Sequence, residues 1–412
     1  MPDYTDSKYR WYILSLGIAT HMFAAAIPFM CMPVLFEEIS LDLGLNLVQI
    51  GVVWGMIGLP GVFCGFASGM ITDKYGAART LGVACLAAGL IGAARGLSDN
   101  FATLTAMMFL FGIFYIPLGS ATHKAAGQWF SAKQLGLANG LLAAGMGAGN
   151  MIGASISATV LSPLFGGWRN LVFVYGGIAL VIGILWLTAK RVPTSEKNLL
   201  SPDNIPFRQS LSHVIRLKPV WMLSIFMLCI GGYFAGLTGY IPLYLLSIDW
   251  STTGASMALT LFTGMSILGA VPLTLISDKL GRRKTLLYVA IISVIIALVL
   301  LVIFGGSAAW VSMVLAGLVQ EAFFALSITV LIETDGVGAA YAGTALGLTG
   351  TLAGIGSFIV PPIGNRLALI DPRLTFLLWI VLAVAALLSV YFIKETGWRR
   401  NDLKIRKDLS KI

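Results

Sequence analysis

The segment Asp73-Lys-Tyr-Gly-Ala-Ala-Arg-Thr80 returns 205 residues later as Asp278-Lys-Leu-Gly-Arg-Arg-Lys-Thr285. Each copy lies between two long apolar runs, so each is predicted to be a charged hairpin that joins two membrane helices. Self-similarity at this spacing indicates a chain built from two homologous halves. Repeated halves are typical of polytopic membrane proteins, and of secondary transporters in particular.

The composition agrees with a membrane protein. Of the 412 residues, 58% are hydrophobic and 11% are charged, and the mean hydropathy is +0.89. Soluble domains carry roughly 25% charged residues, so the composition excludes an ordinary soluble domain. Runs of about 20 apolar residues alternate with short polar breaks, which predicts an all-α membrane protein with twelve transmembrane helices. The predicted spans are 11–36, 47–71, 79–98, 101–121, 136–162, 170–189, 219–246, 254–276, 285–305, 308–331, 341–364 and 374–393.

The basic residues are distributed unevenly between the predicted loops. All but four of the 27 Lys and Arg residues lie on the side of the predicted membrane that also carries both termini. The four exceptions are Arg95, Arg169, Arg366 and Arg373. The positive-inside rule therefore predicts a multi-pass protein of the cytoplasmic membrane with both termini in the cytoplasm. Topology and contact with anionic membrane lipids explain the net charge of +9, so nucleic acid is not expected as a partner.

A second repeat supports the division into halves. Gly136-Leu-Ala-Asn-Gly140 recurs as Gly343-Thr-Ala-Leu-Gly347, so the fifth predicted span corresponds to the eleventh. Because six spans separate the copies, the two halves are parallel repeats. We predict an N-terminal six-helix bundle (1–189), a cytoplasmic linker (190–218), a C-terminal six-helix bundle (219–393) and a cytoplasmic tail (394–412).

The repeated hairpin resembles the signature of the major facilitator superfamily, G-x-x-x-D-[RK]-x-G-[RK]-[RK]. The first copy, from Gly69 to Arg79, has alanines in place of the two basic residues, and the second has Thr274 in place of the first glycine. The resemblance covers essentially the whole chain. It implies two pseudo-symmetric bundles that rock about a central site. It also implies that each hairpin aspartate lies near the cytoplasmic start of a helix of the other bundle, the eleventh for the first copy and the fifth for the second, and helps to hold the bundles together in the outward-open state. The gating residues so implied are Asp73, Lys74, Gly76, Arg79, Asp278, Lys279, Gly281 and Arg282.

A narrower resemblance covers the fifth span and the loop before it. Trp129-Phe130 and the glycines from Gly140 onward are similar to monocarboxylate, oxalate/formate and nitrate carriers, although Gln134 and Leu135 replace the paired arginines of those families. Drug exporters of the superfamily carry proline at the position of Asn150, which favours import or exchange here. However, spans 47–71, 254–276 and 341–364 contain no Arg or Lys with which to grip a dianion or nitrate.

Two ionisable side chains are predicted at mid-membrane depth, where such groups are costly and therefore functional candidates. Glu321 and His21 each lie roughly 16–20 Å from a helix end, at 1.5 Å per residue. The resemblance implies that their helices, the tenth and the first, line the central cavity. Both groups can exchange a proton near neutral pH; a structural hydrogen bond is the alternative for each. Weaker polar candidates are Tyr115, Tyr233, Gln320 and Asn150.

We therefore expect a secondary transporter that moves a small organic solute, with a monocarboxylate favoured, coupled to H⁺ and acting as a monomer. The alternative is a proton-driven exporter of lipophilic or cationic compounds, which Glu321 would attract. A membrane sensor would need a soluble output domain, and none is recognised. No nucleotide-binding loop with GK[ST] and no clustered His/Asp/Cys site occurs in the sequence, so neither an enzyme nor a cofactor is expected.

Overall fold

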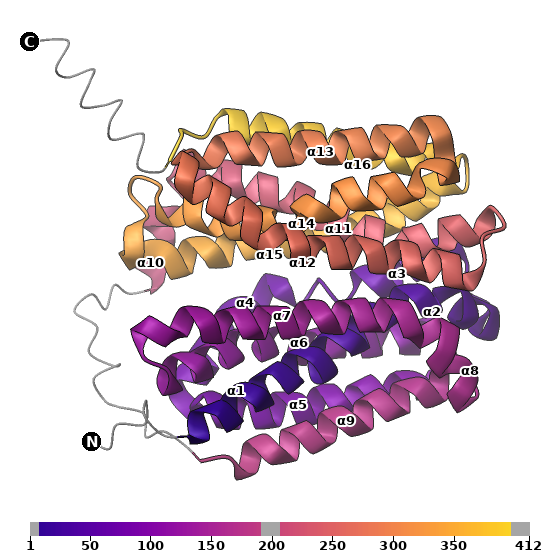
Figure 1. The fold of residues 1–412 in the computed structure, drawn as a ribbon, viewed down its shortest axis with the longest axis horizontal. Helices are drawn as coiled ribbons and strands as arrows, with labels where there is room; N and C mark the ends of the chain where they lie inside the picture. The colour runs from indigo at the N-terminus through magenta and orange to yellow at the C-terminus, as the bar shows by residue number, and fades with distance from the viewer. Residues whose placement is uncertain (1–7, 191–206, 397–412) are drawn as a thin grey trace, which may run out of the picture.

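The computed structural model describes residues 8–190 and 207–396, and this part of the chain is helical without any strand. Two bundles lie side by side, with the N-terminal half below and the C-terminal half above in Figure 1. The N-terminal bundle consists of α1 (Tyr9–Ala19), η2 (Thr20–Ala26), α2 (Ile27–Leu43), α3 (Leu47–Gly55), α4 (Gly61–Tyr75), α5 (Ala77–Ala94), η3 (Arg95–Leu97), α6 (Phe101–Trp129), α7 (Ala132–Ile156), η4 (Ser157–Leu161), α8 (Ser162–Phe165) and α9 (Trp168–Thr188). The C-terminal bundle consists of α11 (Lys218–Ser247), α12 (Thr252–Leu280), α13 (Arg283–Phe304), η6 (Gly305–Ala308), α14 (Ala309–Ile332), α15 (Gly338–Ala368) and α16 (Pro372–Tyr391), preceded by the short helix α10 (Phe207–Val214).

Ten segments of the described chain are long and apolar enough to cross a membrane. One of them, residues 283–332, contains both α13 and α14, and a further membrane helix is broken into α3 and α4. The fold therefore has twelve transmembrane helices, as predicted, in two six-helix bundles. Most of the predicted linker and tail, 191–206 and 397–412, lies outside the described residues.

The second helix is not the continuous span that the sequence predicts. It is interrupted between Gly55 and Gly61, where Ile57 N donates to Trp54 O and Gly58 N donates to Gly55 O in tight i→i+3 turns. Pro60 has no N–H to continue the helix, and the surrounding glycines add backbone freedom. Ile57 lies within this break, and its carbonyl oxygen packs closely against α6. A Cβ atom added to Gly112 of α6 would lie only 2.5 Å from that oxygen.

The repeated hairpins contain glycine for a conformational reason. Gly76 connects α4 to α5 with φ of 84°, and Gly281 ends α12 with φ of 61°. Their N–H groups close equivalent turns, to Thr72 O and to Ser277 O, both at 3.0 Å. A side chain at either position would be strained in this left-handed region, so the glycine repeat is a backbone requirement.

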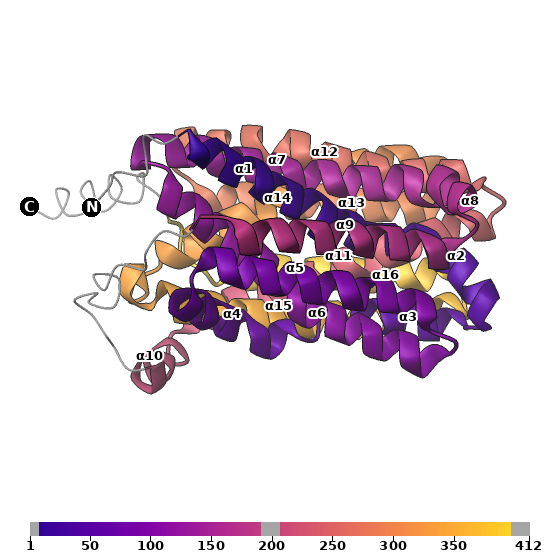
Figure 2. The same cartoon turned by 90° about the horizontal axis from the view of Figure 1, so that it is seen from below.

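The two hairpins, α10 and both described ends of the chain lie at one end of the molecule (Figures 1 and 2). We call this the basic end, because it carries the charged hairpins 73–80 and 278–285. The other end, where α3 begins and α15 finishes, is called the opposite end. Helices therefore run between the two ends in alternating directions, which is the topology expected of a membrane-spanning bundle.

At the opposite end the bundles are in tight contact through α3 and α15. A Cβ atom on Gly55 would lie 2.5 Å from Phe358 O, and Asn365 Nδ2 donates to Leu47 O at 2.8 Å. Towards the basic end the last hydrogen bond between the bundles, within the described residues, runs from Thr351 Oγ1 to Val62 O at 3.2 Å. Beyond it the bundles are less closely packed: no atom lies within 4 Å of a Cβ position on Gly136, Gly140, Gly343 or Gly350. The molecule is therefore closed at the opposite end and open at the basic end.

Candidate functional site

Glu321 on α14 and Tyr115 on α6 face the space between the bundles from opposite sides. The Glu321 side chain is exposed, although its neighbours Gln320 and Ala322 are almost completely buried. The carboxyl group lies within electrostatic range of Tyr115, which belongs to the other bundle. An exposed acid that interacts across the bundle boundary faces an internal space that solvent can reach from the basic end, so the two residues form the centre of the candidate site.

An aromatic cluster closes this space towards the opposite end. Tyr115 stacks on Phe29 of α2 with ring centroids 5.3 Å apart, and Phe29 lies 4.8 Å from the Trp54 ring. Trp54 is fully buried and donates from Nε1 to Ala235 O of α11 at 2.8 Å. The cluster thus joins the first, second and fourth helices to the seventh. Flat aromatic faces above a carboxyl group are suited to a small organic solute that has its own apolar surface.

His21 is buried in a stretch of π-helix within the first transmembrane helix. Its Nδ1 atom is 3.1 Å from Leu142 O, while Nε2 is buried and has no hydrogen-bond partner among the described residues. Such π-segments are frequent at functional sites. Here the segment is held by Thr20, whose Oγ1 accepts from Trp186 Nε1 at 2.7 Å.

His123 is a candidate that the sequence analysis missed. Its ring lies edge-to-face with that of His21, with centroids 5.4 Å apart, and its Nδ1 is 3.0 Å from Asn139 Oδ1. Unlike His21, it is exposed on the side of the basic end. The apolar run ends near residue 121, so His123 was predicted to lie in a loop, but α6 continues to Trp129 and places it on a helix beside His21.

Both candidate amides have buried polar atoms without a hydrogen-bond partner in the described chain. Neither Gln320 Nε2 nor Gln320 Oε1 finds a hydrogen bond in the described chain, and the same is true of Asn150 Oδ1 on α7. Burying an amide without a partner costs about 1–3 kcal/mol on protein-based scales. Polar atoms kept at this cost are available to a solute or to water, although no contact joins either amide to Glu321.

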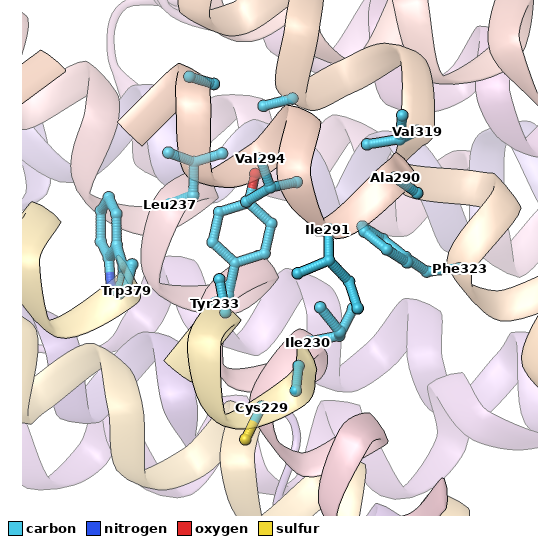
Figure 3. Close-up of a cluster of buried hydrophobic side chains, with 14 of the residues drawn as sticks. Cys229, Ile230, Tyr233, Leu237, Ala290, Ile291, Val294, Val319, Phe323 and Trp379 are labelled. Carbon is cyan, nitrogen blue, oxygen red and sulfur yellow. The ribbon is translucent and has the colours of Figure 1, made fainter. Parts of the chain in front are cut away.

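Tyr233 lies away from the site, contrary to the expectation that it contacts solute. Its side chain is completely buried in the apolar core of the C-terminal bundle, beside Leu237, Ile291 and Val294 (Figure 3). Its hydroxyl has no hydrogen-bond partner in the described residues. α11 carries this face towards α13, so a solute between the bundles cannot reach the hydroxyl in this conformation.

Arg95, one of the four basic residues predicted on the side of the membrane away from the termini, follows α5 at the end furthest from the basic end. It is completely buried, donates from Nε to Gly92 O at 3.1 Å and from Nη1 to Pro28 O at 3.0 Å, and lies 4.3 Å from the centroid of the Phe111 ring. The sequence shows Arg95 only as the first charge after an apolar run. Its burial depends on the carbonyl that Pro28 offers from another helix.

The hairpin charges make their contacts within each bundle. Asp73 pairs with Lys124 at the end of α6, and Asp278 pairs with Arg283, which also contacts Glu333 at 3.4 Å. The contact with the opposite bundle that the resemblance implies belongs to the outward-open conformation. In the present conformation the ion pairs of the two aspartates are local, and the gating role stays a prediction.

The charged residues among the remaining gating candidates are exposed at the basic end. Lys74 lies 5.3 Å from the Tyr75 ring centroid, and Arg79 lines an apolar cavity of about 520 Å³ between α4, α5 and α6. Lys279 and Arg282 are exposed. Together with Gly76 and Gly281, these residues form the two turns and do not take part in the central site.

Comparison with known proteins agrees with this architecture. The profile of the family described as Major Facilitator Superfamily matches residues 14–361 and 247–411. The 4-hydroxybenzoate transporter PcaK of Pseudomonas aeruginosa is 24% identical over 318 residues, which are 68% of this chain and 69% of that protein. The hexuronate transporter of Bacillus subtilis is 25% identical over 174 residues, and the match spans 40% of this chain and only 41% of that transporter.

Among solved structures, a mutant of the nucleoside transporter NupG superposes with a TM-score of 0.77 and 14% identity, over 92% of this chain and 99% of that one. At this identity the likeness concerns the fold alone. The twelve helices, the repeated hairpin and the profile match over most of the chain lead to one conclusion: this chain belongs to the Major Facilitator Superfamily of membrane transporters.

Proposed function

We propose that the protein carries a small organic acid across the cytoplasmic membrane by alternating access, and that Glu321 couples this movement to a proton. The observation that carries the proposal is the exposed Glu321 carboxyl group facing Tyr115 across the space between the bundles. The relatives named as hexuronate and 4-hydroxybenzoate transporters support a carboxylate as the cargo.

The charge of Glu321 supplies the coupling. An ionised Glu321 would repel a carboxylate solute, whereas a protonated one can donate a hydrogen bond to it. Solute and proton then bind together and leave together. The aromatic faces of Phe29 and Tyr115 favour a solute with a flat or apolar part.

The basic end is proposed to face the cytoplasm, on the strength of its Lys and Arg content. The structure would then be the inward-open conformation. Each bundle has its own buried core, and the proposed site lies between two bundles of the same chain. Because a single chain supplies the whole site, these observations support a monomer as the working unit. The hairpin cations Lys74, Lys279 and Arg282 are exposed and available to anionic lipid head groups.

The test is uptake of carboxylates, amines and sugars by proteoliposomes that contain a pH indicator. We expect carboxylate uptake to be accompanied by proton entry and to fall as the external pH rises. Glu321→Gln should abolish the solute-driven pH change, whereas Glu37→Gln, a carboxyl at the far end of the first helix, should not. Full proton coupling in Glu321→Gln would refute the role of this acid, and transport of lipophilic cations alone would favour export.

A further inference from the structure

The short helix α10 precedes the seventh transmembrane helix and is fastened to the start of the eleventh. Ser210 Oγ is 2.6 Å from Thr344 Oγ1, and His213 Nε2 donates to Gly336 O at 2.8 Å. The His213 ring stacks on Tyr341 with centroids 4.2 Å apart and an angle of 24°. Val214 is completely buried beneath the helix. α10 is therefore a defined element of the C-terminal bundle.

A cavity of about 510 Å³ lies between α10 and α15, and it shares no lining residue with the candidate solute site. Its lining side chains carry positive charge and polar groups and include no carboxylate. The lining residues are Arg208, Gln209, Ser212, His213, Arg216 and Tyr341. Neither Arg208 nor Arg216 has an ion pair with any residue that the structure describes.

We propose that this cavity binds a phosphate-bearing anion. The guanidinium groups of Arg208 on α10 and of Arg216 in the turn after it can each give two parallel hydrogen bonds to phosphate oxygens, and Ser212 and Tyr341 add hydroxyl donors. Tyr341 belongs to the first turn of α15, so the positive end of that helix's dipole lies near the cavity. The same groups offer little to a neutral solute, so the cavity selects for negative charge.

The phosphate group can come from a lipid or from a soluble phosphate ester. Ile215 and Trp221 flank the end of α10 with 44% and 39% of their surfaces exposed, and Trp221 Nε1 donates to Ile215 O at 2.8 Å. Exposed tryptophan and isoleucine beside cations are typical of the membrane interface. A phospholipid head group can therefore reach the arginines, as can a small molecule from the aqueous side.

Binding would fasten α10 more firmly to α15. The ligand would contact Arg208 on α10, Arg216 just after it and Tyr341 on α15, so it adds a bridge to those made by Ser210 and His213. Since α10 leads directly into α11, the ligand would stiffen the entry of the chain into the C-terminal bundle. The measurable consequence is stabilisation of the folded protein on binding.

The experiment uses the full-length protein in a zwitterionic detergent, with phosphatidylglycerol, phosphatidylcholine, glycerol 3-phosphate and inorganic phosphate as probes. Retained ligand is measured by native mass spectrometry and the melting temperature by scanning fluorimetry. We expect phosphatidylglycerol to bind and stabilise, and Arg208→Gln/Arg216→Gln to weaken its binding about tenfold or more, as the loss of two charge-assisted contacts requires. Lys8→Gln/Lys394→Gln removes two exposed basic-end charges elsewhere and should bind like the wild type.

Ser212→Asp provides a second variant in case the double mutant does not fold. It keeps both arginines but places a negative charge in the cavity, so it should also lose the anion, whereas Ser212→Ala should retain it. Binding of phosphatidylglycerol and of glycerol 3-phosphate supports a general phosphate site, and binding of phosphatidylglycerol alone supports a lipid site. Equal binding by the wild type, the double mutant and Ser212→Asp, or no retention of any phosphate probe, would overturn the proposal.

Discussion

Gly147 on α7 and Ile267 on α12 meet so closely that a Cβ atom on Gly147 would lie 2.4 Å from Ile267 Cγ1. The contact related to it by the two-fold repeat joins Gly354 on α15 to Val62 on α4. A Cβ atom on Gly354 would lie 3.5 Å from Val62 N. The two glycines are 207 residues apart and the two apolar residues are 205 apart, which are the offsets of the sequence repeats. The bundles therefore meet at two pseudo-symmetric contacts near the middle of the membrane.

A large side chain at Gly55 should prevent closure at the opposite end. A Cβ atom there would lie 2.5 Å from Phe358 O, a backbone atom that cannot move aside alone. We expect Gly55→Leu to shift the protein away from the conformation described here. Spin labels at the exposed positions Leu41 and Leu369 should then give longer distances in pulsed electron resonance. Gly177→Leu, where no atom lies within 4 Å, is the matched control and should leave the distances unchanged.

Removing the Tyr115 hydroxyl should weaken solute binding without abolishing proton coupling. Tyr115→Phe keeps the stacking on Phe29 but loses the polar group that faces Glu321. The loss of one hydrogen bond to the solute would cost about 0.5–1.5 kcal/mol of binding free energy, which corresponds to a two- to tenfold rise in KM. Tyr115→Ala also removes the ring and should raise KM further. A normal KM in both variants would show that the solute does not contact this residue. The measurement is initial uptake at graded solute concentrations.

His123 should carry protons between His21 and the aqueous space at the basic end. The Nε2 atom of His21 lacks a partner in the described chain, and the nearby His123 ring is exposed. We expect His123→Gln and His21→Gln to slow net proton-coupled uptake by about a hundredfold or more, the lower end of what a positioned proton-transfer group contributes. Solute counterflow, which needs no net proton movement, should change little. Equal loss in both assays would indicate a structural role for the pair.

Arg95 should contribute to folding stability from within the N-terminal bundle. Arg95→Ala removes two hydrogen bonds to backbone carbonyls and a contact with the Phe111 ring, and it leaves a cavity in the bundle. Together these losses should lower the free energy of unfolding by about 3–5 kcal/mol. The melting temperature of the detergent-solubilised protein reports this loss. Arg366→Ala changes the same residue type at an exposed position and should have little effect. An unchanged melting temperature in Arg95→Ala would contradict the packing argument.

The number of helices and their two-fold repetition could be predicted because these properties are local in a membrane protein. Each spanning helix satisfies its own backbone hydrogen bonds, so its position follows from the length of an apolar run. The break in the second helix had a visible signal in Gly55, Gly58, Pro60 and Gly61. It was missed because hydropathy measures how apolar the side chains are and does not report where a proline removes a backbone N–H donor.

The sequence by itself determined the twelve spans, the repeat and the isolation of Glu321 in an apolar helix. Only the tertiary structure decided which side of each helix faces the solute space. Tyr115 and Tyr233 lie on equally apolar helices, yet one lies within electrostatic range of Glu321 and the other is buried in a bundle core. The reason is physical: where every face of a helix is hydrophobic, its rotation is set by the packing of neighbouring helices and not by its own pattern.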